Sequence, residues 1–313
     1  MTVQTNAFLT YDAVGNRENL SEVIKSLSPE ETPFSNAIGS TDGKGILYEW
    51  QTDALAAADA NNAVLEGDIV DGTASTPTTR EKNYCQISRR DVVVSSTQEK
   101  VKKAGRSSEM GYQVAKRLKE LKRDIEAVIV GNQGYNAGAT GTARRTRSIE
   151  SFLATNVDRG ATGANAAGAT SAATDGTARP FTEAMLKGVI QSCYTEGASP
   201  NFLSVGPFNK GVVSGFTGRS QARQAIADDK IQAAAHLYAS DFGEIKVMPN
   251  RFQRERTALV VDPEYAEIAF LRPPQVKDLA RTGDSERKYV VAEYALCVKN
   301  EKAHGAIADL DVA

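Results

Sequence analysis

One segment of the sequence carries a long helical pattern of apolar residues. The pattern predicts an α-helix over residues 107–131, longer than most helices of globular proteins. Its apolar residues recur at alternating spacings of four and three, which places them in one stripe along the helix: Val114, Leu118, Leu121, Ile125 and Val128. Such a stripe is covered by protein in the folded state.

Polar residues define the ends and the far side of this helix. Ser107 or Ser108 can accept a hydrogen bond from an early backbone N–H, and Gly131 and Gly134 favour termination. The side opposite the stripe is basic and carries Lys116, Arg117, Lys119, Lys122 and Arg123. A face of this kind either stays in solvent or binds a negatively charged partner.

Two segments rich in β-branched and aromatic residues precede the helix and predict strands, at residues 46–51 and 83–95. The long connection between them contains mostly Ala, Asp, Asn, Gly and Thr and can bury little apolar surface. We therefore expect an extended β-hairpin loop. The stretch 46–79 has no Lys or Arg and six acids: Glu49, Asp53, Asp59, Glu66, Asp68 and Asp71.

The basic helix follows this acidic loop directly. Residues 100–123 contain nine bases and two acids. Because a projecting loop cannot easily fold back along the helix that follows it, we expect the loop to lie across the helix of a neighbouring copy. Exposed ion pairs contribute about 0 to 1 kcal/mol each, so these charges would set register and encounter rate. The alternative is a solubilising loop and a solvated helix.

The rest of the chain predicts a second, mixed α+β region with flanking segments. The N-terminus predicts an arm with a short helix over 20–27. Residues 160–178 are almost all Gly, Ala, Ser or Thr and predict a loop, which could be ordered by contacts with other subunits. Pro273-Pro274 is expected to break the chain. The predicted helices and strands of the later part cover 182–197, 202–205, 226–237, 244–248, 257–261, 289–299 and 306–310, with a short helix after Gly206-Pro207 and the last two segments pairing beside the long helix.

Composition excludes several classes of protein. The 313 residues carry a formal net charge of −2, which argues against a chain that is basic throughout and binds nucleic acid tightly. No signal peptide and no run of about 18 apolar residues is present, so we expect no membrane partner and a place in the cytosol or in something assembled there. Cys85, Cys193 and Cys297 are too far apart in sequence for a disulfide framework or a metal site.

The sequence offers no convincing catalytic or cofactor site. Residues 39–45 resemble a phosphate-binding loop only loosely, with the wrong spacing to Lys44 and no helix after it. His236 and His304 have no nucleophile motif near them. We therefore expect no enzyme activity, no cofactor and no bound metal.

Three short stretches carry a resemblance to a known family. Leu27–Phe34 (LSPEETPF), Thr146–Asn156 (TRSIESFLATN) and Glu293–Gly305 (EYALCVKNEKAHG) resemble the major capsid proteins of tailed bacteriophages. The order of predicted elements is similar to the Johnson, or Hong Kong ninety-seven-like, α+β fold. That fold has an N-terminal arm, an extended β-hairpin loop, a long spine helix in a peripheral domain and a mixed α+β axial domain.

The resemblance implies a domain organisation and partners. It places the arm at 1–40, the extended loop at 41–98, the peripheral domain at 99–180 with 265–313, and the axial domain at 181–264. It implies self-assembly into hexamers and pentamers that close an icosahedral virion shell around double-stranded DNA in the host cytoplasm, with portal, scaffolding and cement proteins as further partners. The loop has no lysine for an isopeptide cross-link.

Two points stay open at the level of sequence. Packaged DNA would contact basic residues on the inner wall, for which Arg144, Arg145 and Arg147 are candidates. The same fold also serves encapsulin compartments that enclose cargo enzymes, and a soluble α+β enzyme or ligand-binding protein is a third alternative.

Overall fold

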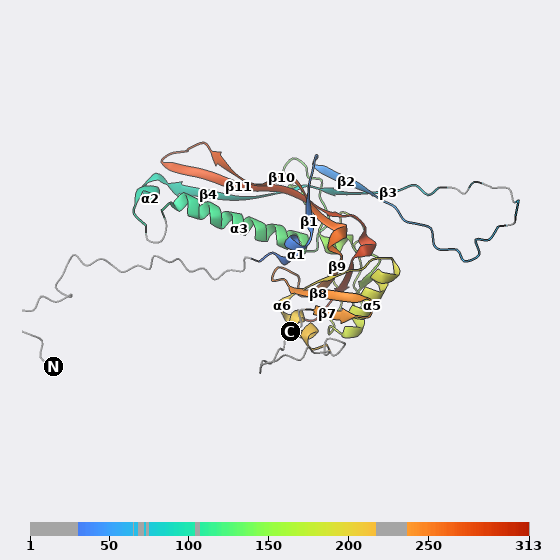
Figure 1. The fold of residues 1–313 in the computed structure, drawn as a ribbon. Helices are drawn as coiled ribbons and strands as arrows, with labels where there is room; N and C mark the ends of the chain where they lie inside the picture. Colours follow the sequence, from blue (N-terminus) through green and yellow to red (C-terminus); the bar gives the residue numbers. More distant parts are fainter. Residues whose placement is uncertain are drawn as a thin grey trace, which may run out of the picture.

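The computed structural model describes residues 31–64, 66–67, 72, 75–103, 107–216 and 237–312. Within these residues the strands form a four-stranded sheet, a six-stranded sheet and a separate two-stranded hairpin (Figure 1). The helix expected over 20–27, most of the arm 1–40, the Ala-rich run from Ile226 and His236 lie outside the described residues. The short helices are α1 (Pro33–Ala37), α2 (Ser96–Lys100), α4 (Ile149–Phe152), η2 (Pro263–Tyr265) and η3 (Glu301–Ala303).

The long predicted helix is confirmed as α3 (Glu109–Ile129), slightly shorter than the pattern indicated. Ser108, and not Ser107, caps it by accepting a hydrogen bond from the backbone N–H of Gly111 at 3.0 Å. The predicted stripe faces the core: Leu121 and Ile125 are 0% and 4% exposed. The other three members of the stripe are half-buried against the same core, so the helix is held along its length.

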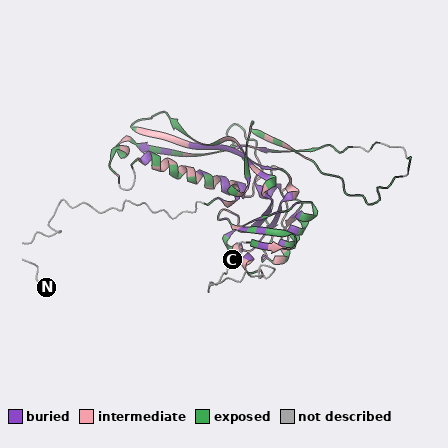
Figure 2. Cartoon of the chain, in the orientation of Figure 1, coloured by how far each residue is buried: buried purple, intermediate pink, exposed green. Residues whose placement is uncertain are grey.

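The surface that α3 covers is the four-stranded sheet, in the order β1-β10-β11-β4. β10 and β11 pair antiparallel, as do β11 and β4, whereas β1 runs parallel to β10. Figure 2 shows buried residues concentrated where the helix meets this sheet. The strands are β1 (Gly39–Asp42), β10 (Ala266–Leu279), β11 (Ser285–Val298) and β4 (Gln86–Ser95).

The six-stranded sheet forms the second part of the body, in the order β5-β12-β9-β6-β8-β7. Its central strand β9 is buried on both faces: Leu259 and Val261 face the core under α3, and Ala258 and Val260 face the core under α5. The two cores are therefore continuous through one strand. The elements are α5 (Glu183–Thr195), β6 (Phe202–Val205), α6 (Pro207–Ser214), β7 (Leu237–Ser240), β8 (Gly243–Pro249), β9 (Thr257–Val261), β5 (Val157–Asp158) and β12 (Gly305–Ala308).

The two C-terminal strands do not pair with each other, which corrects the sequence prediction. β11 packs beside α3 as expected, but β12 joins β5 and β9 in the six-stranded sheet. All four residues of β12 are buried. A strand of small and apolar residues that is buried on both faces requires a place inside a sheet, and the six-stranded sheet provides one.

Pro273 and Pro274 do not break the chain, contrary to prediction, because β10 continues through them. The pairing of β10 with β11 shifts register between Phe270 and Arg272 and again between Arg272 and Gln275. The prolines, which have no N–H to donate, lie in this irregular part of the ladder.

The Gly- and Ala-rich stretch 160–178 is an irregular loop, as predicted, but its own chain holds it in place. The Asp309 carboxylate, 1% exposed, accepts hydrogen bonds from Gly160 N at 3.0 Å and Gly176 N at 2.6 Å. A Cβ on Gly176 would lie 2.4 Å from the backbone nitrogen of Gly163, so this close approach requires glycine. Hydrogen bonds within one chain therefore contribute to ordering this loop.

Candidate subunit interface

The feature that departs most from a compact subunit is the hairpin of β2 (Leu47–Thr52) and β3 (Thr79–Tyr84). The two strands pair antiparallel from Leu47 opposite Tyr84 to Thr52 opposite Thr79, which confirms the predicted hairpin. The predicted second strand divides at Cys85, after which β4 leaves the hairpin and joins the four-stranded sheet. The predicted range 41–98 for the loop therefore includes a strand of the body.

The described acidic residues of the hairpin lie on its surface. Glu49 forms a 3.7 Å ion pair with Arg80 across the strands, and the two side chains are 37% and 66% exposed. Asp53, Asp59 and Glu66 are exposed. Asp68 and Asp71 lie outside the described residues. The base of the hairpin is thus partly neutralised by Arg80 and the part beyond it remains acidic.

The five basic residues predicted on α3 divide into two groups. Lys116, Lys119 and Lys122 are exposed. Arg117 is half-buried and forms a 2.5 Å ion pair with Glu120, and the Arg123 guanidinium lies 5.5 Å from the centre of the Phe252 ring. The three lysines form an exposed row, which we call the lysine row, and the side chains of the two arginines are only partly exposed.

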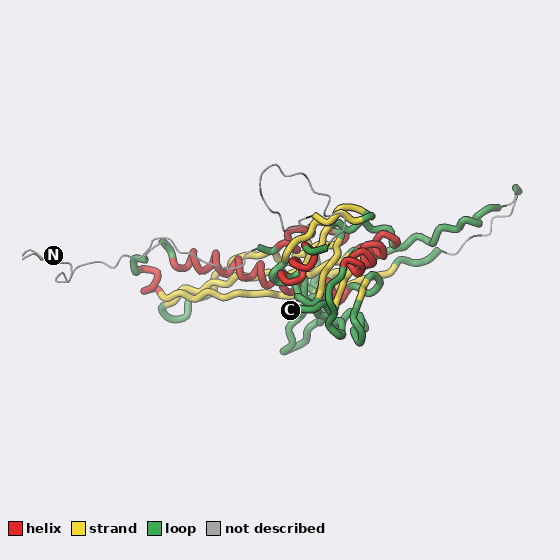
Figure 3. Tube along the Cα trace, turned by 90° about the horizontal axis from the view of Figure 1, so that it is seen from below, coloured by secondary structure: helices red, strands yellow, loops and turns green. Residues whose placement is uncertain are grey.

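The hairpin and the lysine row lie in opposite parts of the subunit. In Figure 1 the hairpin extends to the right, while α3 runs to the left toward α2. The view from below shows the same separation (Figure 3). The described acidic residues beyond β2 therefore lie on the opposite side of the body from the lysine row of their own chain. A second copy is needed to bring the two together.

The three arginines proposed to contact DNA have different surroundings. The Arg144 guanidinium forms a 2.6 Å ion pair with the buried Glu293 carboxylate, and Arg145 is exposed. Arg147 is only 8% exposed, lies 4.1 Å over the Phe152 ring and donates to the Ser151 carbonyl at 2.5 Å. Arg147 is thus a structural residue, which corrects its assignment to a DNA-facing surface.

Glu126 joins three segments and was not singled out in the sequence. Its buried carboxylate accepts hydrogen bonds from the backbone N–H groups of Phe34 and Ser35 at 2.8 Å each and from Asn250 Nδ2 at 2.7 Å. It holds the start of α1 against α3. In the sequence Glu126 directly follows Ile125 of the apolar stripe. A carboxylate at the edge of a buried stripe needs hydrogen-bond donors, so this position could have identified Glu126 as a structural residue.

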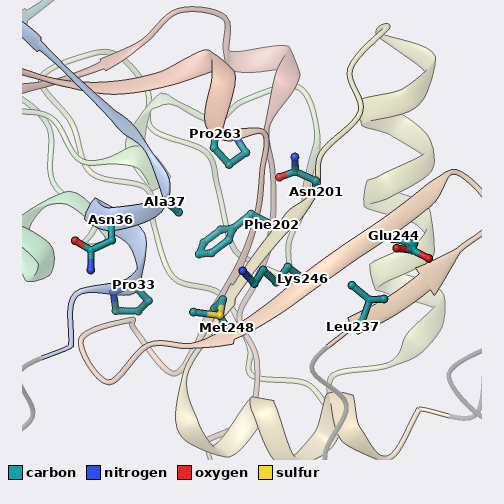
Figure 4. Close-up of a pocket in the computed structure, with 10 residues that line it drawn as sticks. All are labelled: Pro33, Asn36, Ala37, Asn201, Phe202, Leu237, Glu244, Lys246, Met248 and Pro263. Carbon is teal, nitrogen blue, oxygen red and sulfur yellow. The ribbon is translucent and has the colours of Figure 1, made fainter. Parts of the chain in front are cut away.

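A groove lies between α1 and the six-stranded sheet (Figure 4), with a volume of about 560 Å³. Phe202 and Met248 are among its apolar lining residues, and Lys246 and Glu244 are its charged ones. This lining contains neither a histidine nor a cysteine. The groove therefore offers no Ser–His or Cys–His pair.

The cysteines and the described histidine are buried. Burial raises the pKa of the Cys85 thiol to about 11 and that of Cys297 to about 12, so both stay protonated at neutral pH. Among the described residues no group of three metal-binding side chains lies together, and no helix there is long and apolar enough to span a bilayer.

Solved structures with the same arrangement define the class of protein. A chain from Gordonia phage Cozz has a TM-score of 0.62 at 12% identity, covering 99% of this chain and 98% of that one. The capsid of cyanophage A-1(L) has a TM-score of 0.66 at 13% identity, covering 96% and 98%. An encapsulin complex from Synechococcus elongatus has a TM-score of 0.56 at 10% identity, covering 95% and 92%. The chain therefore has the Johnson fold of phage capsids, which encapsulins share.

Two sequence matches separate these alternatives. The chain is 26% identical to the major capsid protein of Escherichia phage Phieco32, over 96% of each sequence. The family model for the SU10 major capsid protein matches residues 3–311, and the chain belongs to this family. It is a phage major capsid protein, a structural protein of the virion capsid that associates with copies of itself. The encapsulin likeness is one of fold alone.

Proposed function

We propose that copies of this chain form hexamers and pentamers, which close into an icosahedral shell around double-stranded DNA in the host cytoplasm. The role is structural and involves no catalysis. In this proposal residues 1–40 act as an arm, 41–98 include the extended loop, 99–180 with 265–313 form the peripheral domain and 181–264 the axial domain. Family membership supports the shell, and the projecting hairpin supports a contact between neighbours.

The exposed hairpin is the observation that carries this proposal. Leu55 is 100% exposed and Val64 is 80% exposed, although both are apolar. A subunit that remained alone would leave these side chains in water, which is unfavourable. Covering the hairpin with a neighbouring subunit removes that cost, and an extended shape allows each subunit to reach beyond the body next to it.

Charge indicates where on the neighbour the hairpin lies. The part of the hairpin beyond β2 carries Asp53, Asp59 and Glu66 without a described base beside them, and the lysine row of α3 is exposed. We place the hairpin of one subunit across α3 of the next. Since exposed ion pairs are weak, these charges select the register of the contact, while buried area supplies most of its free energy.

A charge exchange tests this contact. Changing Lys116, Lys119 and Lys122 to Glu should abolish closed particles in negative-stain electron microscopy, because the loop then meets like charge. Adding Asp53→Lys, Asp59→Lys and Glu66→Lys to the same chain should restore particles, since opposite charges face each other again. A control chain with Lys44, Lys187 and Lys277 changed to Glu has the same net charge as the first variant and should assemble. Normal particles from the lysine-row variant would refute the proposed pairing.

Further partners follow from a shell that is filled with DNA. The exposed Arg145 is the member of the predicted arginine set best placed to bind phosphate without reading sequence. Arg144 is largely engaged by Glu293. Portal and scaffolding proteins, together with a cement protein, complete the proposed set of partners, because a closed shell needs an entry for DNA and a guide for its curvature.

A further inference from the structure

The hairpin meets the body at a joint of one residue. β3 ends at Tyr84 and β4 begins at Gln86, so only Cys85 separates the projecting strand from a strand of the four-stranded sheet. Cys85 is fully buried, and its N–H donates to the Ile46 carbonyl at 2.8 Å on the other side of the hairpin. The direction of the hairpin is therefore decided within a few residues of Cys85.

Asn83 lies just before this joint, is 0% exposed, and uses both ends of its amide. Its Nδ2 donates to the Leu296 carbonyl of β11 at 2.7 Å and to Thr146 Oγ1 at 2.9 Å. Its Oδ1 accepts from the backbone N–H of Arg147 at 2.8 Å. A single side chain thus connects the hairpin to two separate segments of the body.

Thr146 contacts the chain on both sides of the joint. Its Oγ1 accepts from Asn83 Nδ2, and its backbone N–H donates to Gln86 Oε1 at 3.2 Å. The same Oγ1 also accepts from Leu296 N at 3.2 Å, which anchors Thr146 to β11. We call Asn83, Thr146 and Gln86 the brace, because together they fix β3 and β4 relative to each other.

The other strand of the hairpin is held differently. Trp50 of β2 packs on Phe152 with ring centres 6.0 Å apart and an interplanar angle of 45°. Its indole Nε1 is buried and has no hydrogen-bond partner in the described part of the chain. Ring contacts tolerate sliding and rotation far better than directional hydrogen bonds do. β2 also makes a long hydrogen bond to the body, from the Tyr48 hydroxyl to Glu267 Oε1 at 3.5 Å. The shorter hydrogen bonds of the brace therefore constrain the angle more than the contacts of β2 do.

We propose that the brace, with Asn83 as its central positioning residue, sets the angle at which the hairpin leaves the body and hence where it lands on a neighbouring subunit. This rests on the proposed contact between hairpin and neighbour. The leverage is large: about 12 extended residues reach roughly 40 Å, so a turn of about 10° at the joint displaces the far end by about 7 Å. A displacement of that size moves the hairpin off its register.

The test uses the one tryptophan of the chain as a reporter of hairpin position. Asn83→Ala and Thr146→Val each remove the Asn83–Thr146 hydrogen bond. In dilute, unassembled full-length subunits both should shift the Trp50 emission to longer wavelength, as the indole moves away from Phe152. The fraction of protein in closed particles should fall about tenfold. A tenfold change corresponds to a loss of about 1.4 kcal/mol in the free energy of association. Thr146→Ser keeps the hydroxyl and should behave as wild type in both measurements.

A matched control separates positioning from stability. Asn156 is 3% exposed and donates to the Lys302 carbonyl at 2.7 Å, and its hydrogen bonds do not involve the brace. Asn156→Ala should lower the unfolding midpoint much as Asn83→Ala does, yet leave the Trp50 emission and the particle fraction unchanged. Wild-type emission and particle fraction in Asn83→Ala and Thr146→Val would overturn the proposal, as would equal loss of particles in Asn156→Ala.

A deletion distinguishes this inference from the proposed function. Replacing residues 54–77 by a short Gly linker leaves the brace intact and should abolish particles while the Trp50 emission stays that of wild type. Normal particles from the deletion variant would refute the hairpin contact itself. Loss of particles in the deletion variant together with normal particles in Asn83→Ala would refute the brace alone.

Discussion

Buried polar side chains connect distant segments of this subunit. Asn83 links the hairpin to β11, Glu126 links α3 to α1, and Asp309 holds the Gly-rich loop. Each is buried and has its main hydrogen-bonding atoms satisfied, which is the condition under which burial of a polar group does not destabilise a fold. Such residues fix geometry more than they add stability, and a shell subunit depends on its geometry.

His304 gives a prediction at the same scale. The ring is 0% exposed, Nδ1 accepts from the Asp262 N–H at 3.3 Å, and Nε2 lies 3.4 Å from the Tyr265 carbonyl oxygen. Burial lowers the pKa of His304 to about 4, so the folded state holds the ring neutral. In the unfolded chain the ring binds a proton below about pH 6.5. Lowering the pH from 7.5 to 5 should therefore lower the free energy of unfolding by about 2 kcal/mol through His304 alone.

Urea unfolding of unassembled subunits at these two pH values measures the loss. The contribution of the neutral His304 ring to the free energy of unfolding is fully present above about pH 6.5 and is lost as the pH falls toward 4. His304→Gln cannot titrate and should show a pH dependence smaller by this amount, even though its stability at pH 7.5 is lower. Equal pH slopes in the two proteins would contradict the assignment.

Among the elements, those with a strong local signal were predicted correctly from sequence. The stripe of α3 and the apolar run of β9 are periodic or continuous over enough residues to define the element. The path of β10 through Pro273 and Pro274 could not be predicted, because a bulge depends on the partner strand. The place of β12 likewise depends on which sheet has an open position beside β9.

The cap of α3 provides a test at this scale. Ser108→Ala removes the side-chain acceptor for Gly111 N and should lower the free energy of unfolding by about 1 kcal/mol. Ser107→Ala, one residue earlier, should change it by less than about 0.5 kcal/mol, as surface substitutions usually do. Chemical denaturation of the two variants under one set of conditions measures the difference. Equal losses would mean that the helix begins elsewhere.

For the molecule as a whole, the proposed contact between the acidic hairpin and the lysine row predicts that association depends on ionic strength. Raising NaCl from about 0.1 M to 1 M shortens the Debye length from about 10 Å to 3 Å, so long-range attraction between subunits is lost. The initial rate of assembly, followed by light scattering, should fall about tenfold. The chain with all three lysines of the row changed to Glu lacks this attraction, and any residual association should not slow with added salt. An unchanged rate for the wild-type chain would show that charge does not steer assembly.

The sequence by itself determined the long amphipathic helix, the acidic loop before it, the α+β character and the family, because local periodicity, composition and short motifs are properties of contiguous residues. Only the tertiary structure decided which basic residues stay accessible, since Arg117, Arg123 and Arg147 are engaged by Glu120, Phe252 and Ser151. It alone also showed the brace beside Cys85, because residues 83 and 86 meet residue 146 only when separate segments fold together.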